Sequence, residues 1–199
     1  MLGGGGHALV VVEAARLAGF DVLGLFDDAR DTAASRLLGL DWLGTLDQAS
    51  AWRESPLFLA IGDLGVRRRV LARPPSGLTQ APVIAHPSAI VLASATLGPG
   101  AFVGPRAVVH SFAQVAPHAT INTGAIVEHE CRIGENAHIA PGAVLGGRVT
   151  IGPDTLVGLG SRVLPNLSVG AGSVIGGGAV VHRDVPDGVT VVGVPARAR

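Results

Sequence analysis

The sequence is poor in cysteine, in net charge and in long apolar stretches, and each shortage excludes a class of protein. A single cysteine in 199 residues excludes an internal disulfide framework and fits a reducing compartment. Fifteen basic and fifteen acidic residues provide no excess charge for nucleic acid or an anionic membrane. The apolar runs are shorter than a membrane-spanning helix, and the N-terminus has no basic leader with a cleavage site. We therefore expect a cytoplasmic protein with no nucleic-acid or membrane partner.

Glycine and small or branched aliphatic residues are abundant instead, and in the second half of the chain they repeat every six residues. Every sixth residue from Val91 to Val181, 16 positions in all, is Val, Ile or Leu. The position two residues earlier is alanine from Ala89 to Ala143, except for Cys131. Six residues suit one short strand and one turn rather than a helix. Three such units close a triangular prism with stacked aliphatic residues inside, and Cys131 is expected to be structural.

The composition changes near residue 82, which divides the chain. The segment 1–80 holds both tryptophans and an arginine run at 67–69, whereas Gly, Pro, Val and Ala dominate afterwards. We expect a small α/β, Rossmann-like domain over residues 1–81, a parallel β-helix of about five coils over residues 82–185, and a C-terminal tail over residues 186–199.

Ionisable side chains gather at one level of this apolar scaffold. Residues 128–138 include Glu128, His129, Glu130, Arg132, Glu135 and His138. Since three six-residue units make one coil, Gly147 lies directly above His129, and its N–H is about 5 Å away. A histidine can take a proton from a nucleophile, and an N–H can stabilise an oxyanion. The pair predicts an acyl-transfer site, although a solvated surface is an alternative explanation for the other charges.

His138 is expected to lie on a different side of the prism. It precedes the inward-facing Ile139 and so points outward from a flat face, whereas His129 lies at the edge between the other two faces. The two imidazoles can then meet only if a neighbouring subunit supplies one of them. This geometry predicts a site between subunits.

Four segments resemble a known family. The segments NTGAIVEHECRIG, VLPNLSVG, SVIGGGAVV and VVGVPARAR are similar to those of hexapeptide-repeat nucleotide-sugar acetyltransferases, the sialic-acid-O-acetyltransferase-like group. The best-matching members N-acetylate a UDP-linked 4-amino sugar or GDP-perosamine. The resemblance implies a left-handed β-helix, a homotrimer, acetyl-CoA as cosubstrate, a nucleotide-activated amino sugar as acceptor, and no metal.

The same resemblance assigns roles to individual residues. It implies that His129 is the general base, that Glu130 orients it, and that Asn122 lies in the same site. His138 and the backbone of Gly147 would contact the acetyl carbonyl. Acetyl-CoA would also lie along the backbone of the upper coils, at Gly176, Gly177, Gly178 and Ala179.

The N-terminal part is expected to hold the nucleotide. Glycines before a helix let backbone N–H groups approach a phosphate. By the resemblance, the nucleotide is surrounded by a Gly-rich turn, an Asp pair and an Ile-Gly-Asp turn, namely Gly3, Gly5, Gly6, His7, Asp27, Asp28, Gly62 and Asp63. Asp27 or Asp28 would read the base; a simple strand-end turn is the alternative for this pair. Only Met1 and Leu2 precede Gly3, so we expect a truncated first strand that leaves backbone groups unpaired.

Three other functions remain open at this stage. A sugar O-acetyltransferase would use the same scaffold and base. A zinc enzyme of the γ-carbonic-anhydrase type would need three converging histidines, and the spacing of His110, His118, His129 and His138 does not match that family. A non-catalytic sugar-nucleotide-binding protein would be unaffected by acetyl-CoA.

Overall fold

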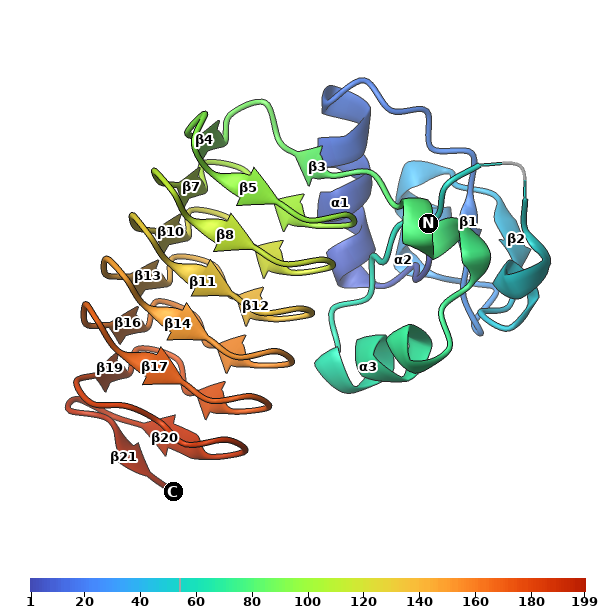
Figure 1. Ribbon diagram of the computed structural model, residues 1–199. Coiled ribbons are helices and arrows are strands. Elements are labelled where there is room, and N and C mark those ends of the chain that lie inside the picture. The colour runs from blue at the N-terminus through green and yellow to red at the C-terminus, as the bar shows by residue number, and fades with distance from the viewer. Residues whose placement is uncertain (54) are drawn as a thin grey trace.

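The computed structural model describes residues 1–53 and 55–199, which form a small α/β part packed against the side of a long β-helix (Figure 1). Within its described residues, the N-terminal part contains three α-helices, two short strands and two 3₁₀ helices. They are α1 (Gly6–Leu17), β1 (Leu25–Phe26), α2 (Ala33–Leu38), β2 (Trp42–Gly44), η1 (Gln48–Ala51), α3 (Leu64–Ala72) and η2 (Ser76–Gln80).

The β-helix has three sheets, one for each face of the prism. The six-stranded sheet holds β4 (Ile90–Val91), β7 (Val108–Val109), β10 (Ile126–Val127), β13 (Val144–Leu145), β16 (Arg162–Val163) and β19 (Val180–Val181). The five-stranded sheet holds β5 (Thr96–Leu97), β8 (Gln114–Val115), β11 (Arg132–Ile133), β14 (Thr150–Ile151) and β17 (Ser168–Val169). The eight-stranded sheet holds β3 (Ile84–Ala85), β6 (Phe102–Val103), β9 (Thr120–Ile121), β12 (His138–Ile139), β15 (Leu156–Val157), β18 (Val174–Ile175), β20 (Thr190–Val192) and β21 (Arg197–Ala198).

The register of the coils follows the sequence period. Val127 pairs in parallel with Val109 of the preceding coil on one side and with Leu145 of the following coil on the other. From Ala101 to Val181 the periodic aliphatic residues and the alanines two positions before them are buried and form one continuous core, and Ala89, Val91, Ala95 and Leu97 of the first coil pack against it while only partly buried. Cys131 is buried among them, its thiol donates to the Gly146 carbonyl over 3.1 Å, and burial raises its pKa to about 11. The thiol is therefore a packing group.

The C-terminal residues continue the prism. In the segment expected as a tail, β20 pairs in parallel with β18, and β21 folds back antiparallel on β20. Val191 and Ala196 are buried in the same core as the coils. The end of the eight-stranded sheet is thus covered by the chain's own last strands.

Leu2, in the segment expected as a truncated first strand, forms isolated bridges to its neighbours on both sides. Leu2 forms parallel bridges with Phe26 and with Leu59. Its N–H donates to the Phe58 carbonyl over 2.7 Å, and its carbonyl accepts from Ala60 over 2.8 Å. Leu2 is fully buried. The backbone of Leu2, which was expected to be unpaired, is therefore hydrogen-bonded at both its N–H and its carbonyl. A cavity of about 180 Å³ lies beside Met1.

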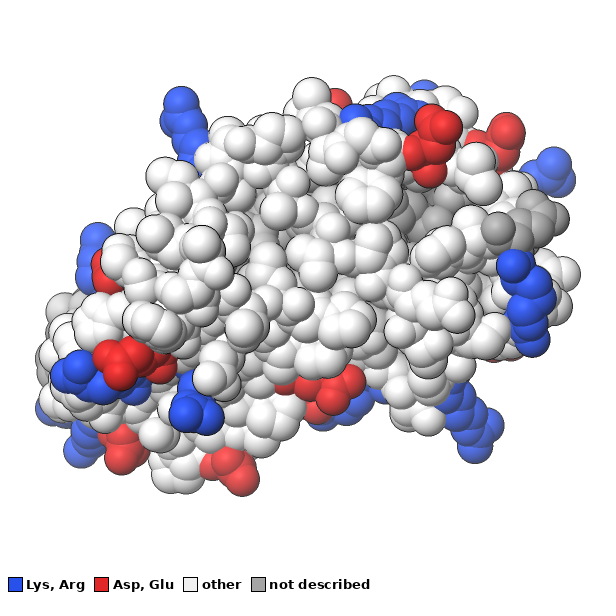
Figure 2. Space-filling view, turned by 45° about the horizontal axis from the view of Figure 1, so that its top comes forward, with Lys and Arg blue, Asp and Glu red and all other residues white. Residues whose placement is uncertain are grey.

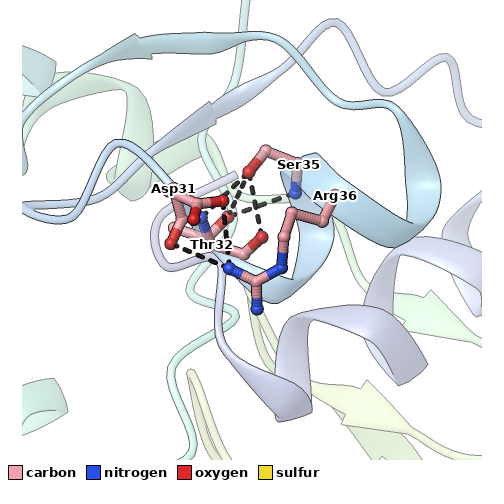
Figure 3. Close-up of polar contacts among 4 residues, drawn as sticks. All are labelled: Asp31, Thr32, Ser35 and Arg36. Carbon is pink, nitrogen blue, oxygen red and sulfur yellow. Dashed lines mark hydrogen bonds and ion pairs between the residues drawn. The ribbon is translucent and has the colours of Figure 1, made fainter.

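The Gly-rich turn is also fastened to α2. Thr32 caps α2 by accepting from the Ser35 N–H over 3.1 Å, and the Ser35 hydroxyl accepts from the Thr32 N–H over 2.9 Å (Figure 3). The next turn adds an ion pair between Arg36 and Asp31, 3.0 Å long. Gly4 lies against this cap, and its carbonyl accepts from the Ala34 N–H over 2.9 Å. The start of α2 thereby fixes one side of the turn.

Charged side chains on the face seen in Figure 2 are scattered around a broad uncharged area. Among the residues that the structure describes, no helix is long and apolar enough to cross a membrane.

Candidate active site

His129 lies in the turn between β10 and β11, with its two ring nitrogens in different surroundings. Its Nδ1 is 3.0 Å from a carboxylate oxygen of Glu130. A carboxylate only accepts hydrogen bonds, so a neutral His129 carries its proton on Nδ1 and leaves Nε2 free to accept one. Arg148, one coil further on, lies 3.6 Å from the same carboxylate oxygen, and its Nε donates to Asn166 over 2.7 Å. The arrangement orients an imidazole that is half-exposed.

Gly147 lies directly against this imidazole. A β-carbon at Gly147 would come within 2.4 Å of the His129 Nε2 atom, so only glycine leaves room for the ring here. The Gly147 carbonyl accepts a hydrogen bond from the Asn166 N–H, whereas the Gly147 N–H has no hydrogen-bond acceptor in residues 1–53 and 55–199. The structure thus places the His129 Nε2 atom against Gly147, as the stacking of successive coils predicts.

His138 lies in β12 on the eight-stranded sheet, and only 9% of it is exposed. The Asn122 side chain reaches its Nε2 over 3.1 Å. Because the Asn122 oxygen already accepts from the Thr123 N–H over 2.8 Å, the amide NH₂ is the donor to His138. The proton of a neutral His138 is therefore on Nδ1, which is buried and has no partner in the described part of the chain.

His7, in the first turn of α1, packs beside His138. The centroids of the two rings are 5.8 Å apart, and Phe102 contacts His7 edge-on at the same distance. The pKa of His7 is lowered to about 4, mainly because the ring is buried and to a smaller extent because Arg67 is positively charged. The pKa of His138 is lowered to about 3, mainly because the ring is buried and to a smaller extent because of electrostatic repulsion from His7 and Arg67. Both imidazoles are therefore neutral at physiological pH.

A groove of about 720 Å³ runs over the same face of the β-helix. The Gly62 and Asp63 turn before α3 forms one wall, Asn122 and His138 lie in it, and Gly176 with Gly177 continues it along the upper coils. Its lining is mainly apolar and includes Pro141, Leu156 and Leu159, none of which was expected from the sequence. Leu156 is the outward-facing residue of β15, and Pro141 and Leu159 lie in the turns after β12 and β15, so the period identifies their face but not the groove.

The other three acetyl-CoA candidates, Gly147, Gly178 and Ala179, do not line the groove. Gly178 is exposed at the next turn, and the Ala179 side chain is buried in the core. The Ala179 N–H donates to Gly176 and its carbonyl accepts from Arg162. Its contact with a ligand stays a prediction.

The Gly-rich turn leads directly into α1. Gly5 is the residue before the helix, with no side-chain cap and no acidic residue in the first turn, so the first N–H groups of the helix remain available to an anion. Asp27 is occupied elsewhere, because its oxygens accept from Gly4 over 2.8 Å and from Ala29 over 2.9 Å. Asp28 accepts from the Leu46 N–H over 3.2 Å and is exposed. Of the pair, Asp28 has the freer carboxylate.

Comparison with known proteins agrees with this architecture. The family model "PglD N-terminal domain" matches residues 1–73, and the model "Bacterial transferase hexapeptide (six repeats)" matches residues 112–147. PerB from Caulobacter crescentus, solved with CoA and GDP-perosamine, is 36% identical, with a TM-score of 0.91 over 100% of this chain and 95% of that one. The chain belongs to the hexapeptide-repeat sugar N-acetyltransferases. The expected α/β domain and left-handed parallel β-helix are confirmed.

Two further members of this family give the same result. The acetyltransferase domain of PglB from Neisseria gonorrhoeae is 32% identical, with a TM-score of 0.92 over 100% of this acetyltransferase and 97% of that chain. It has also been solved with acetyl coenzyme A. WeeI from Acinetobacter baumannii is 26% identical, with a TM-score of 0.84 over 100% and 99% of the two chains. Comparison with curated protein sequences found no match.

In this acetyltransferase, His129 and His138 lie on different sides of one prism. The turn that carries His129 joins the six-stranded and five-stranded sheets, whereas His138 lies on the eight-stranded sheet opposite that edge. The groove and His129 are therefore on separate surfaces of a single chain. Among residues 1–53 and 55–199, no group of three His, Cys, Asp or Glu side chains is arranged to hold a metal ion.

Proposed function

We propose that this acetyltransferase transfers the acetyl group of acetyl-CoA to the amino group of a nucleotide-linked 4-amino sugar. One observation carries the choice of base: the His129 Nε2 is bare and lies against Gly147, whose N–H has no acceptor among the described residues, while Nδ1 is held by Glu130. The relatives solved with GDP-perosamine and with acetyl coenzyme A support the two substrates.

The reaction then uses groups already in position. The neutral sugar amine attacks the thioester carbonyl, and a new C–N bond forms as the carbonyl becomes an oxyanion. His129 Nε2 accepts the proton that the amine loses. The Gly147 N–H donates to the oxyanion. When the C–S bond breaks, the imidazolium returns that proton to the coenzyme A sulfur, so the products are the N-acetyl sugar and free coenzyme A.

The complete site needs two copies of the chain. We propose a homotrimer in which the groove with Asn122 and His138 on one subunit faces His129 of the next. Acetyl-CoA would lie in the groove along Gly176 and Gly177, and its thioester would reach the His129 edge of the neighbouring β-helix. The separation of the two histidines on one prism supports this arrangement.

The nucleotide of the acceptor is assigned to the Gly-rich turn. The uncapped start of α1 offers N–H groups to the diphosphate, and Asp28 is the better placed of the two aspartates to contact the base or ribose. Because acetyl-CoA and sugar nucleotides are both intracellular metabolites, we place the reaction in the cytoplasm, where the reduced Cys131 is stable.

The test is release of coenzyme A from acetyl-CoA in the presence of GDP-, UDP- and dTDP-linked 4-amino-4,6-dideoxy sugars. One of them should be turned over, and His129→Ala should reduce kcat by about 10²-fold or more. Release only with hydroxyl-bearing sugars would show an O-acetyltransferase instead. No release with any sugar, together with tight binding of a nucleotide sugar, would show a non-catalytic protein.

A further inference from the structure

Arg67 is the largest side chain that the structure buries completely, with only 1% exposed. It is the first arginine of the run at 67–69 and lies in α3, whereas Arg68 and Arg69 are exposed. Arg67 has no role in the reaction proposed for this site. A guanidinium is strongly hydrated in the unfolded chain, so its complete burial is costly unless several acceptors replace the water.

The guanidinium of Arg67 reaches four acceptors. Nε donates to the Asn136 side-chain oxygen over 2.7 Å. Nη1 donates to the Ile61 carbonyl and the Thr120 hydroxyl, both over 3.2 Å. Nη2 donates to the His118 carbonyl. All four are neutral, and no carboxylate of the described residues pairs with Arg67. The charge is therefore solvated by the protein without being neutralised.

These acceptors belong to both parts of the molecule. Ile61 begins the Ile61–Gly62–Asp63 turn of the N-terminal part. His118 and Thr120 lie at the start of β9, and Asn136 occupies the position equivalent to His118 in the next coil. A single side chain thus joins the turn to two successive coils of the β-helix.

The connection extends one coil further through the neighbouring arginine. The Asn136 amide donates to Asp154 over 2.7 Å, and the other oxygen of Asp154 is 3.1 Å from the Arg68 Nε. His118, Asn136 and Asp154 occupy equivalent positions in three successive coils and form one column along an edge of the prism. The start of α3 is held against this column.

The turn fixed in this way is a wall of the groove. Gly62 and Asp63 line it opposite the upper coils, with Asn122 and His138 between. We expect loss of the Arg67 contacts to loosen this wall, which then keeps only the Arg68–Asp154 pair among the contacts described above. The backbone of Gly176 and Gly177 should keep its place because it belongs to the β-helix alone.

We propose that Arg67 is a positioning residue of the active site, which sets the separation between the Ile61–Asp63 turn and the β-helix face that carries Asn122 and His138. The inference rests on the proposed function, since the turn is taken to hold the nucleotide sugar and the upper coils to hold acetyl-CoA. Its charge also helps to keep the neighbouring His7 and His138 neutral.

The experiment compares Arg67→Met, Arg67→Lys and the control Arg16→Met, which replaces an exposed arginine in the last turn of α1. We expect Arg67→Met to raise KM for the nucleotide sugar at least tenfold and to change KM for acetyl-CoA less than threefold. Lysine keeps the charge and reaches some of the same acceptors, so Arg67→Lys should recover part of the loss. The control should match the wild type in both constants.

Hydrogen exchange of the Gly62–Gly65 amides gives a second measurement that needs no turnover. It should be faster in Arg67→Met than in the wild type, with no change in the β-helix strands. Unchanged KM values, or equal increases in both, would overturn the positioning role. If the wild type fails to acetylate any sugar, the proposed function is wrong, and unchanged exchange in Arg67→Met would then be the result that overturns this inference.

Discussion

The Nε2 atom of His129 occupies the space that a β-carbon on Gly147 would need, at a separation of 2.4 Å. The substitution Gly147→Ala must therefore displace the imidazole. We expect kcat to fall at least tenfold, with a melting temperature close to that of the wild type because the half-exposed ring can swing outward. A variant that retains full kcat would show that the observed pose of His129 is not the reactive one.

Glu130 holds the Nδ1 side of the same ring, so Glu130→Gln should lower kcat. The amide can turn its oxygen to the ring but does not stabilise the imidazolium that forms during attack. We expect a loss of about 10- to 100-fold, less than that for His129→Ala. Glu135→Gln is the matched control, since Glu135 is an exposed glutamate in the same cluster, and it should match the wild type. Equal losses in both variants would point to a general effect of surface charge rather than to Glu130.

Acid should destabilise the protein through its two buried histidines. The native pKa is about 4 for His7 and about 3 for His138, whereas an unfolded histidine titrates near pH 6.5. Between pH 6.5 and about 4 the unfolded chain binds more protons, so stability falls as the pH is lowered through this window and is unaffected above it. At pH 4.5 each histidine lowers the free energy of unfolding by on the order of 2 kcal/mol.

Urea unfolding at pH 7 and pH 4.5 checks this dependence. His138→Gln removes one of the two groups, so the stability difference between the two pH values should shrink relative to the wild type. Carboxylates titrate in both proteins and cancel in the comparison. An undiminished difference would mean that His138 is accessible to protons in the native state.

Cys131 occupies a position that is alanine in the neighbouring coils, and this predicts that Cys131→Ala is tolerated. The variant loses the thiol contact with Gly146 and little volume, so the free energy of unfolding should change by about 1 kcal/mol or less. Because burial raises the pKa of the thiol to about 11, a thiol reagent should label the wild type only after denaturation. Rapid labelling of the folded protein would contradict the buried position.

The sequence period accounts for much of the site and misses other parts for a physical reason. The stacking of successive coils is enough to place Gly147 over His129 and to put His138 on the opposite face. Arg67 escapes this reasoning because three of its four acceptors lie 51 to 69 residues away in the chain, and contacts between the N-terminal part and the β-helix leave no periodic signal. The pairing of the short first strand escapes it as well, since Leu2 is held by hydrogen bonds to Phe58 and Ala60, which a local pattern cannot indicate.

The position of His129 and His138 on separate faces leads to a complementation test of the intersubunit site. If each site combines His129 of one subunit with His138 of the next, neither His129→Ala nor His138→Ala alone forms an intact site. A mixed trimer of the two variants does form one, because the His138→Ala subunit supplies His129 and the His129→Ala subunit supplies His138.

Co-expression with two affinity tags and purification through both should therefore restore a substantial fraction of wild-type kcat. Co-expression of His129→Ala with His129→Gln is the control and should remain inactive. Mixed trimers that stay as inactive as their parents would place both histidines of each site on one chain, or remove His138 from the reaction.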